Sequence, residues 1–425
     1  MPDYKIEEIM TIKRESPYVT RTKPLMVKPR LSESNFGIRS RIRKVIIGDG
    51  IIAIGENAFE NCKALCEIEI SDNVIAIGNE AFSGCTGLKG IAIPQGVVAI
   101  GLKTFKGCTE LARIDFPENL TEIDQWAFDG CTRLSSMAIP SRVKKIGKWA
   151  FANCTSITSA IIPEGVTEVN DCTFYGCTGL SSVTIPDSVT KIGWSAFRGC
   201  TGLTSVVIPA SVTEIGNEAF SGCTGLTSVT IMNTEVSIVE YSGFLVRRSR
   251  RPKTCLVISS NAFNNCTELK APIIAGHNLL FHRNAVGDYV IPESIKVICQ
   301  DAFLGSTGLT SVTIPGSVTK IGYGAFSLSG VEALFLEQGI TIIWQGAFAN
   351  MDKLVSVTLP DSVTEIGKFA FQGCSSLADI TIPQDVKFID QHAFDDCWNL
   401  KAAMVPRTTK YGSTVFPPTC KVTKY

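Results

Sequence analysis

The sequence has few of the residues from which most enzyme active sites are built. Its 425 residues include only three histidines, His277, His282 and His392. These form neither a catalytic triad nor a metal-ligand set, and the chain has no G-x-S-x-G, Walker or H-E-x-x-H motif. No two acidic residues have a spacing that suggests a general acid and a general base. We therefore expect no catalytic residues, no metal site, no cofactor and no enzymatic activity.

The chain also lacks an excess of charge and a long apolar segment. Its 40 basic and 40 acidic residues cancel at pH 7, so no overall field favours nucleic acid or a membrane surface. It has no run of about 18 apolar residues, as a membrane span requires, and its first residues lack the apolar stretch of a secretory signal. These absences predict a cytoplasmic, intracellular protein without a nucleic-acid partner or a membrane span. The alternative is a cell-surface protein exported by an unrecognised route.

What the sequence does have is a repeat. Phenylalanine recurs at a step of 23 residues, and cysteine follows three residues later at the same step. After an irregular interval the unit returns, which gives about fourteen copies. The phenylalanines are Phe59, Phe82, Phe105, Phe128, Phe151, Phe174, Phe197, Phe220, Phe263, Phe303, Phe326, Phe348, Phe371 and Phe394.

One copy, LSSVTIPDSVTKIGWSAFRGCTG, begins at Leu180. Its first residues alternate as in a strand, with Val183 and Ile185 pointing inward. Pro186 ends the strand because it has no N–H for the ladder. Gly193 permits a tight corner, and Ala196–Phe197 are expected to form a short helical or 3-10 turn that fills the centre of the coil.

A unit of this size buries its apolar side only by stacking on a neighbour. Strands of successive coils then pair in parallel, and the phenylalanines and cysteines form columns. One cysteine per coil does not match the paired hooks of a zinc site. We expect reduced, buried thiols that act as small apolar filler, with disulfides between neighbouring coils as the alternative.

The pattern L-x-x-V-x-I-P-x-S-V-x-x-I-G-x-x-A-F-x-G-C resembles the BspA-like class of leucine-rich repeats over roughly residues 45–405. The resemblance implies an α/β horseshoe-type leucine-rich-repeat solenoid that forms a single elongated domain. A parallel β-sheet would cover one face, with short helical or 3-10 turns and loops on the other. The resemblance also implies a tendency toward surface proteins that bind host or matrix proteins.

The regularity of the repeat suggests five segments. These are a basic N-terminal arm or cap at 1–44, regular coils at 45–231, irregular or inserted coils at 232–290, regular coils at 291–405 and a C-terminal cap at 406–425. The irregular segment is interpreted as degenerate coils or protruding hairpins. Insertions in a solenoid often lie on a functional face; the alternative is drift of the repeat without function.

Two groups of charged residues are candidates for contact with a partner. The first lies in the irregular segment and comprises Arg247, Arg248, Arg250, Arg251 and Lys253. It would suit an acidic protein, phosphate groups or an import receptor, or form an ordinary solvated loop. The second lies on the first coils and comprises Glu67, Glu69, Arg113 and Asp115. Outward strand positions elsewhere, such as Thr184, Thr313 and Thr358, predict a Ser/Thr-rich face without aromatic anchors.

The combined prediction is a non-enzymatic, protein-binding scaffold whose protein partner is not identified by the sequence. Two alternatives stay open. One is an adhesion-type protein at the cell surface. The other is a structural protein that forms a homo-oligomer through the ends of its solenoid, where apolar columns need a cap.

Overall fold

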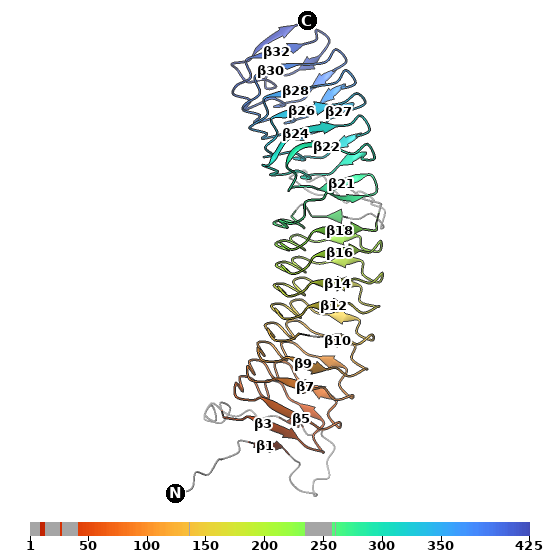
Figure 1. The fold of residues 1–425 in the computed structure, drawn as a ribbon, viewed down its shortest axis with the longest axis vertical. Helices are drawn as coiled ribbons and strands as arrows, with labels where there is room; N and C mark the ends of the chain where they lie inside the picture. Colours follow the sequence, from red (N-terminus) through yellow and green to blue (C-terminus); the bar gives the residue numbers. More distant parts are fainter. Residues whose placement is uncertain (1–8, 13–25, 28–40, 136, 234–256, 260) are drawn as a thin grey trace. The chain divides into compact units, whose positions relative to one another are not determined.

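The computed structural model describes residues 9–12, 26–27, 41–135, 137–233, 257–259 and 261–425. The chain divides into two compact units. Unit 1 consists of Met1–Leu226 with Asn261–Glu268, and unit 2 consists of Thr227–Ser260 with Leu269–Tyr425. Both units are parallel β-solenoids in which one turn of the repeat forms one coil (Figure 1).

A typical coil of unit 1 carries a longer first strand and, after a turn, a two-residue second strand (Figure 1). The first strands are β1 (Ile9–Ile12), β3 (Lys44–Ile47), β5 (Glu67–Ile70), β7 (Gly90–Ala92), β9 (Arg113–Asp115), β12 (Ser159–Ile161), β14 (Ser182–Thr184) and β16 (Ser205–Ile208). The second strands are β2 (Met26–Val27), β4 (Ala53–Ile54), β6 (Ala76–Ile77), β8 (Ala99–Ile100), β10 (Glu122–Ile123), β11 (Lys145–Ile146), β13 (Glu168–Val169), β15 (Lys191–Ile192) and β17 (Glu214–Ile215).

Unit 2 follows the same plan. Its first strands are β18 (Ser228–Ile231), β22 (Gly287–Val290), β24 (Leu309–Ile314), β26 (Ala333–Leu336), β28 (Ser356–Thr358), β30 (Asp379–Thr381), β32 (Ala402–Val405) and β34 (Lys421–Lys424). Its second strands are β19 (Val257–Ile258), β21 (Asn278–Phe281), β23 (Val297–Ile298), β25 (Lys320–Ile321), β27 (Ile342–Ile343), β29 (Glu365–Ile366), β31 (Phe388–Ile389) and β33 (Lys410–Tyr411). One further strand, β20 (Ile273–Ala275), pairs antiparallel with β21.

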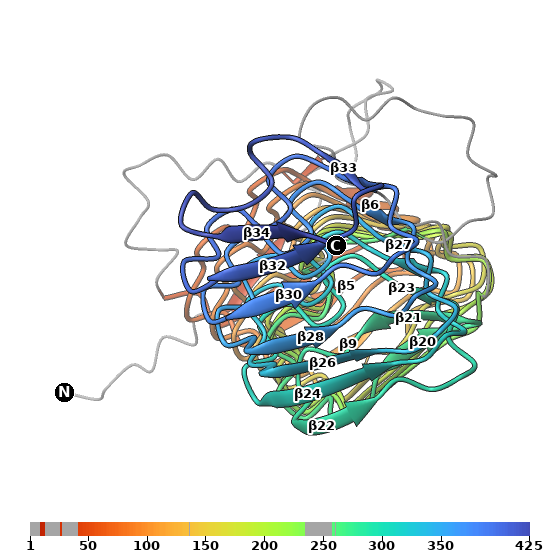
Figure 2. The ribbon, with the colours of Figure 1, turned by 90° about the horizontal axis from the view of Figure 1, so that it is seen from above.

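The two kinds of strand form separate sheets. In unit 2, β30, β32 and β34 lie side by side along one side of the coils, and β27 and β33 lie along another (Figure 2). Apart from β20 with β21, the strands pair in parallel, so that Glu168 faces Lys191 and Lys191 faces Glu214. Each column of side chains on a sheet is therefore made of equivalent positions of the repeat.

The centre of each coil is filled by an aromatic ring, which we call the plug. In unit 1 the plugs run from Phe59 to Phe220 and then to Phe263, with successive ring centroids 5.1–5.6 Å apart and nearly parallel. The predicted phenylalanine column is confirmed. In unit 2 the column continues beyond the predicted positions, because Phe416 stacks on Phe394 at 5.3 Å.

The predicted helical or 3-10 turns around the plugs are wrong, because the described residues contain no helix. The residue two positions before each plug has a positive φ in most coils, as at Trp126 (55°) and Glu80 (56°). A left-handed residue interrupts the right-handed run that a helix requires. The plug N–H instead bonds to the next coil, as from Phe128 to the carbonyl of Ala150 at 2.8 Å.

The irregular stretch before Phe303 contains a coil whose plug is a histidine. His282 is buried, and its ring meets those of Tyr289 and Phe303 edge to face at 4.6 and 5.6 Å. Its backbone N–H bonds to the carbonyl of Ala302, the same bond that a phenylalanine plug makes. Nδ1 of His282 has no hydrogen-bond partner among the described residues, and burial lowers the pKa of the ring to about 4.

The cysteines that stand three residues after the plugs form a column beside them, and all cysteines that the structure describes are free thiols. Most thiols of this column also donate a hydrogen bond to the carbonyl of the plug in the preceding coil, as Cys131 does to Phe105 at 3.1 Å. Burial raises the pKa of Cys108 to about 12 and also raises that of Cys131 well above its ordinary value. The thiolate is the reactive form of a cysteine, so burial disfavours reaction of these thiols while the chain is folded.

Candidate interaction surfaces

The charged residues predicted on the first coils share one outward sheet face in unit 1. Glu67 and Glu69 lie on β5, whereas Arg113 and Asp115 lie on β9 beyond the small residues of β7. Lys44 on β3 pairs with Glu67 at 2.7 Å and with Glu69 at 2.6 Å, and the two carboxylates raise the pKa of Lys44.

The other two candidates on this face neutralise each other. Arg113 donates two hydrogen bonds to Asp115, at 3.0 and 2.8 Å, and this contact raises the pKa of Arg113. Exposed pairs of this kind contribute little to stability and can be exchanged for contacts with another molecule. The face thus offers charge that is already paired within the chain.

The basic cluster Arg247, Arg248, Arg250, Arg251 and Lys253 lies outside the described residues. Along the chain it falls between β18 and β19, the first and second strands that precede the plug Phe263. Its role as a partner site stays a prediction.

The second strands of unit 1 carry a ladder of alternating charge. Lys191 lies between Glu168 and Glu214, 3.5 Å from each, and Lys145 pairs with Glu122 in the same column. Because neighbouring coils are only about 4.8 Å apart, opposite charges at equivalent positions meet without a change of backbone. In this column, each glutamate has a lysine on an adjoining coil.

The first-strand sheet of unit 2 presents an exposed aromatic side chain. Phe335 on β26 is 50% exposed and lies in register between Thr313 on β24 and Thr358 on β28. Val290 on β22, the next residue in the column, is 67% exposed. We call the column of Val290, Thr313, Phe335, Thr358, Thr381 and Met404 the Phe335 face.

The prediction that the outward strand positions lack an aromatic anchor is therefore wrong at Phe335. The coil of Phe335 is one residue shorter than its neighbours, since Phe326 and Phe348 are 22 residues apart. A search at a fixed step of 23 from Thr313 lands on Leu336, which is buried. Counting back 13 residues from each plug instead would have aligned Phe335 with Thr313 and Thr358.

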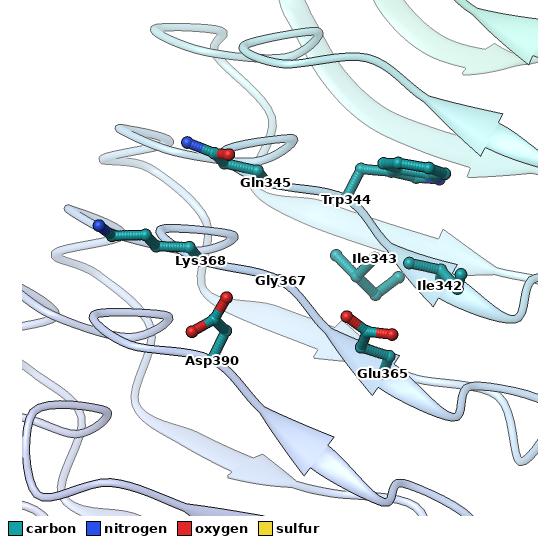
Figure 3. A pocket seen from close by; sticks show the side chains of 8 residues that line it. All are labelled: Ile342, Ile343, Trp344, Gln345, Glu365, Gly367, Lys368 and Asp390. Carbon is teal, nitrogen blue, oxygen red and sulfur yellow. The ribbon is translucent and has the colours of Figure 1, made fainter. Parts of the chain in front are cut away.

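A cavity of about 250 Å³ opens on the second-strand side of unit 2, and we call it the Trp344 pocket (Figure 3). Its lining comes from consecutive coils. The lining residues are Ile342, Ile343, Trp344, Gln345, Glu365, Gly367, Lys368 and Asp390.

The pocket exists because of what occupies the corner after each second strand. Glycine is common there, since a Cβ on Gly367 would lie 2.9 Å from the backbone nitrogen of Gln345. The flanking coils carry Trp344 and Asp390 at the same corner. The pocket thus lies where Gly367 separates the side chains of Trp344 and Asp390.

The described residues contain no group of three or more His, Cys, Asp or Glu side chains able to hold a metal ion. They also contain no helix long and apolar enough to cross a membrane.

Comparisons with known proteins agree with the fold. The family described as BspA type leucine rich repeat region matches residues 30–158, 144–270 and 276–401. A leucine-rich repeat protein from Bacteroides ovatus is similar in structure, with 23% identity, a TM-score of 0.55, and coverage of 90% of this chain and 92% of that one. A leucine rich cell surface protein from Faecalibacterium prausnitzii is 28% identical, with a TM-score of 0.37 and coverage of 90% and 86%. No curated protein sequence matches the chain.

Proposed function

Because this chain belongs to the BspA-type leucine-rich repeat proteins, we propose that it is a non-enzymatic scaffold that binds a protein partner through the Phe335 face. The exposure of Phe335 on the outward face of β26 is the observation that carries this proposal. A folded chain normally hides such a ring, and large aromatic side chains are common anchors of protein interfaces.

The surroundings of Phe335 suit an interface rather than a core. Thr313 and Thr358 flank the ring in the sheet, and Val290 adds apolar surface two coils away, about 10 Å along the column. The neighbouring column includes Asp288, which accepts hydrogen bonds from Thr310 and Ser311 at 2.9 and 2.7 Å. An apolar centre with a polar rim is the usual composition of a protein-binding patch.

We place this scaffold at the cell surface rather than in the cytoplasm, since the family tends toward surface proteins that bind host or matrix proteins. The buried thiol column is compatible with that location, because its raised pKa values protect it from oxidation. Protease treatment of intact cells should remove the protein; complete protection in intact cells together with digestion after lysis would contradict this placement.

The test of the Phe335 face uses a photo-crosslinking amino acid in place of Phe335, and of Trp398 as a matched control. Trp398 is also aromatic and is 63% exposed, but it lies in a turn outside the first-strand sheet. We expect a discrete crosslinked partner from position 335 and none from position 398.

Once that partner is purified, Phe335→Asp should weaken its binding at least tenfold, about 1.4 kcal/mol. Trp398→Asp should leave the affinity unchanged. Equal crosslinking at both positions, or full affinity of the Phe335→Asp variant, would refute a role for this face.

A further inference from the structure

The Trp344 pocket contains a carboxylate, Glu365, for which the described residues supply no counter-ion. Glu365 occupies the same column position as Glu168 and Glu214 of unit 1, which both pair with Lys191. The neighbours of Glu365 in the ladder are instead Ile342 and Phe388. Among the described residues Glu365 has no ion pair, so its charge is available to another molecule.

A second carboxylate lies beside the same space. Asp390 is the corner residue of the following coil, and its backbone N–H bonds to the carbonyl of Ile366 at 2.8 Å. Its Oδ1 accepts the N–H of Gln391 at 2.6 Å, which fixes the orientation of the carboxylate. In Figure 3 the carboxylates of Asp390 and Glu365 stand on either side of Gly367.

One wall of the pocket is the indole ring of Trp344, which comes from the coil before that of Glu365 and already contacts a cation of the chain. Trp344 lies above Glu365 and Ile342 in Figure 3. The ammonium of Lys320, from the preceding coil, lies 4.6 Å from the centre of the indole ring. Lys320 does not line the pocket. The negative face of an aromatic ring attracts cations, so a positive group entering the pocket meets the ring and the two carboxylates together.

The lysine that does line the pocket is engaged elsewhere. The ammonium of Lys368 lies 4.7 Å from the centre of the Phe369 ring. Figure 3 shows its side chain extending away from Glu365. The charge of Lys368 therefore does not neutralise the carboxylate of Glu365.

We propose that the Trp344 pocket receives an arginine side chain of the partner protein. A guanidinium is flat, so it can stack on the indole of Trp344 while its N–H groups bond to Glu365 and Asp390. The cavity of about 250 Å³ lies below the range of about 300–1,000 Å³ for small-ligand sites, which suits one side chain rather than a folded segment. This inference rests on the proposed function, because the arginine belongs to a bound protein.

The experiment measures the pocket directly with a small probe. The protein is labelled with fluorotryptophan, and the signal of Trp344 among the five tryptophans is identified by its loss in Trp344→Phe. Nα-acetyl-arginine amide is then titrated at constant ionic strength, with neutral Nα-acetyl-citrulline amide as the matched probe. We expect a saturable shift of the Trp344 signal with the arginine probe and none with the citrulline probe.

Substitution of the carboxylate tests the mechanism. Glu365→Gln should weaken the arginine probe about threefold, the effect of one exposed ion pair. Glu214→Gln, at the same column position in unit 1, should leave the response unchanged. No shift, an equal shift with citrulline, or equal loss in both variants would overturn the proposal.

The Phe335 face and the arginine site can be refuted independently of each other. Phe335 does not line the Trp344 pocket, so Phe335→Asp should leave the response to the arginine probe intact. Loss of partner binding in Phe335→Asp without a probe response at Trp344 would leave the proposed function standing and remove only the arginine site.

Discussion

Unit 1 and unit 2 use the same coil, but unit 1 repeats its interior far more strictly. The plugs of unit 1 from Phe59 to Phe263 are all phenylalanine, and a buried cysteine follows each one. Unit 2 has His282 as a plug, and the positions that follow three of its phenylalanines hold Ser306, Ser329 and Met351. The column therefore tolerates other residues where the rest of the coil keeps its hydrogen bonds.

The outer surface of unit 2 also repeats less strictly than that of unit 1. In the second-strand ladder of unit 1, Glu168 and Glu214 share Lys191, whereas Glu365 of unit 2 lies between two apolar neighbours. The Phe335 face also belongs to unit 2. Strict repetition places opposite charges on neighbouring coils, and departure from it leaves Glu365 without an ion pair among the described residues. Both proposed sites follow from that difference.

The largest expected effect in this comparison concerns His282. Its pKa is 6.5 in the unfolded chain and about 4 when folded, so the unfolded chain binds the proton first as the pH falls. The contribution of the neutral ring to stability is complete above pH 6.5 and is lost progressively down to about pH 4, by up to about 3 kcal/mol. Urea unfolding of unit 2 should show this loss.

The control is His282→Phe, which restores the plug of unit 1. This variant should lose the part of the pH dependence between pH 6.5 and 5, where few carboxylates titrate. Parallel stability curves for the two proteins over that range would contradict the assignment.

Smaller effects on the free energy of unfolding are expected in the cysteine column. We expect alanine to lower stability at a cysteine of unit 1 and to raise it at a serine of unit 2. Cys131→Ala removes a thiol that donates to Phe105 and leaves a small cavity, so it should cost about 1–2 kcal/mol. The hydroxyl of Ser329 is buried and has no hydrogen-bond partner among the described residues. Ser329→Ala should therefore stabilise unit 2 by about 1 kcal/mol. Urea midpoints that fall in both variants would show that Ser329 has a partner.

The smallest expected effect concerns backbone strain at Leu328. This residue has a φ of 56° and is exposed, whereas the equivalent positions Gly305 and Gly373 hold glycine. Leu328→Gly should raise stability by about 0.5–1 kcal/mol, because only glycine adopts this conformation without strain. Leu328→Ala keeps the strain and serves as the control; an equal gain in both variants would assign the effect to lost apolar surface instead.

Much of the fold could be predicted because the repeat aligns equivalent residues. The step of 23 residues identified the plugs, the thiol column and the inward strand positions such as Ile185. The turn before each plug was predicted wrongly, since a positive φ at Trp126 or Glu80 is imposed by the neighbouring coil and is not favoured by those residue types.

The candidate sites were harder to predict, because they arise where the step changes. Phe335 belongs to a coil shortened by one residue, and His282 lies 21 residues before Phe303 instead of 23. The Trp344 pocket combines the corner residues of three consecutive coils, Trp344, Gly367 and Asp390, which come together only when the coils are stacked. The predicted segment boundaries, 232–290 included, stay predictions.

The bond from each plug to the next coil has a consequence for synthesis of the chain on the ribosome. Phe128 can complete its backbone bond only after Ala150 has been made, and Phe151 only after Thr173. During translation the newest coil always has an open row of donors, which the following coil closes as it emerges. A ribosome that stalls part-way would thus release a product whose older coils are finished and whose last coil is ready to pair with any matching strand.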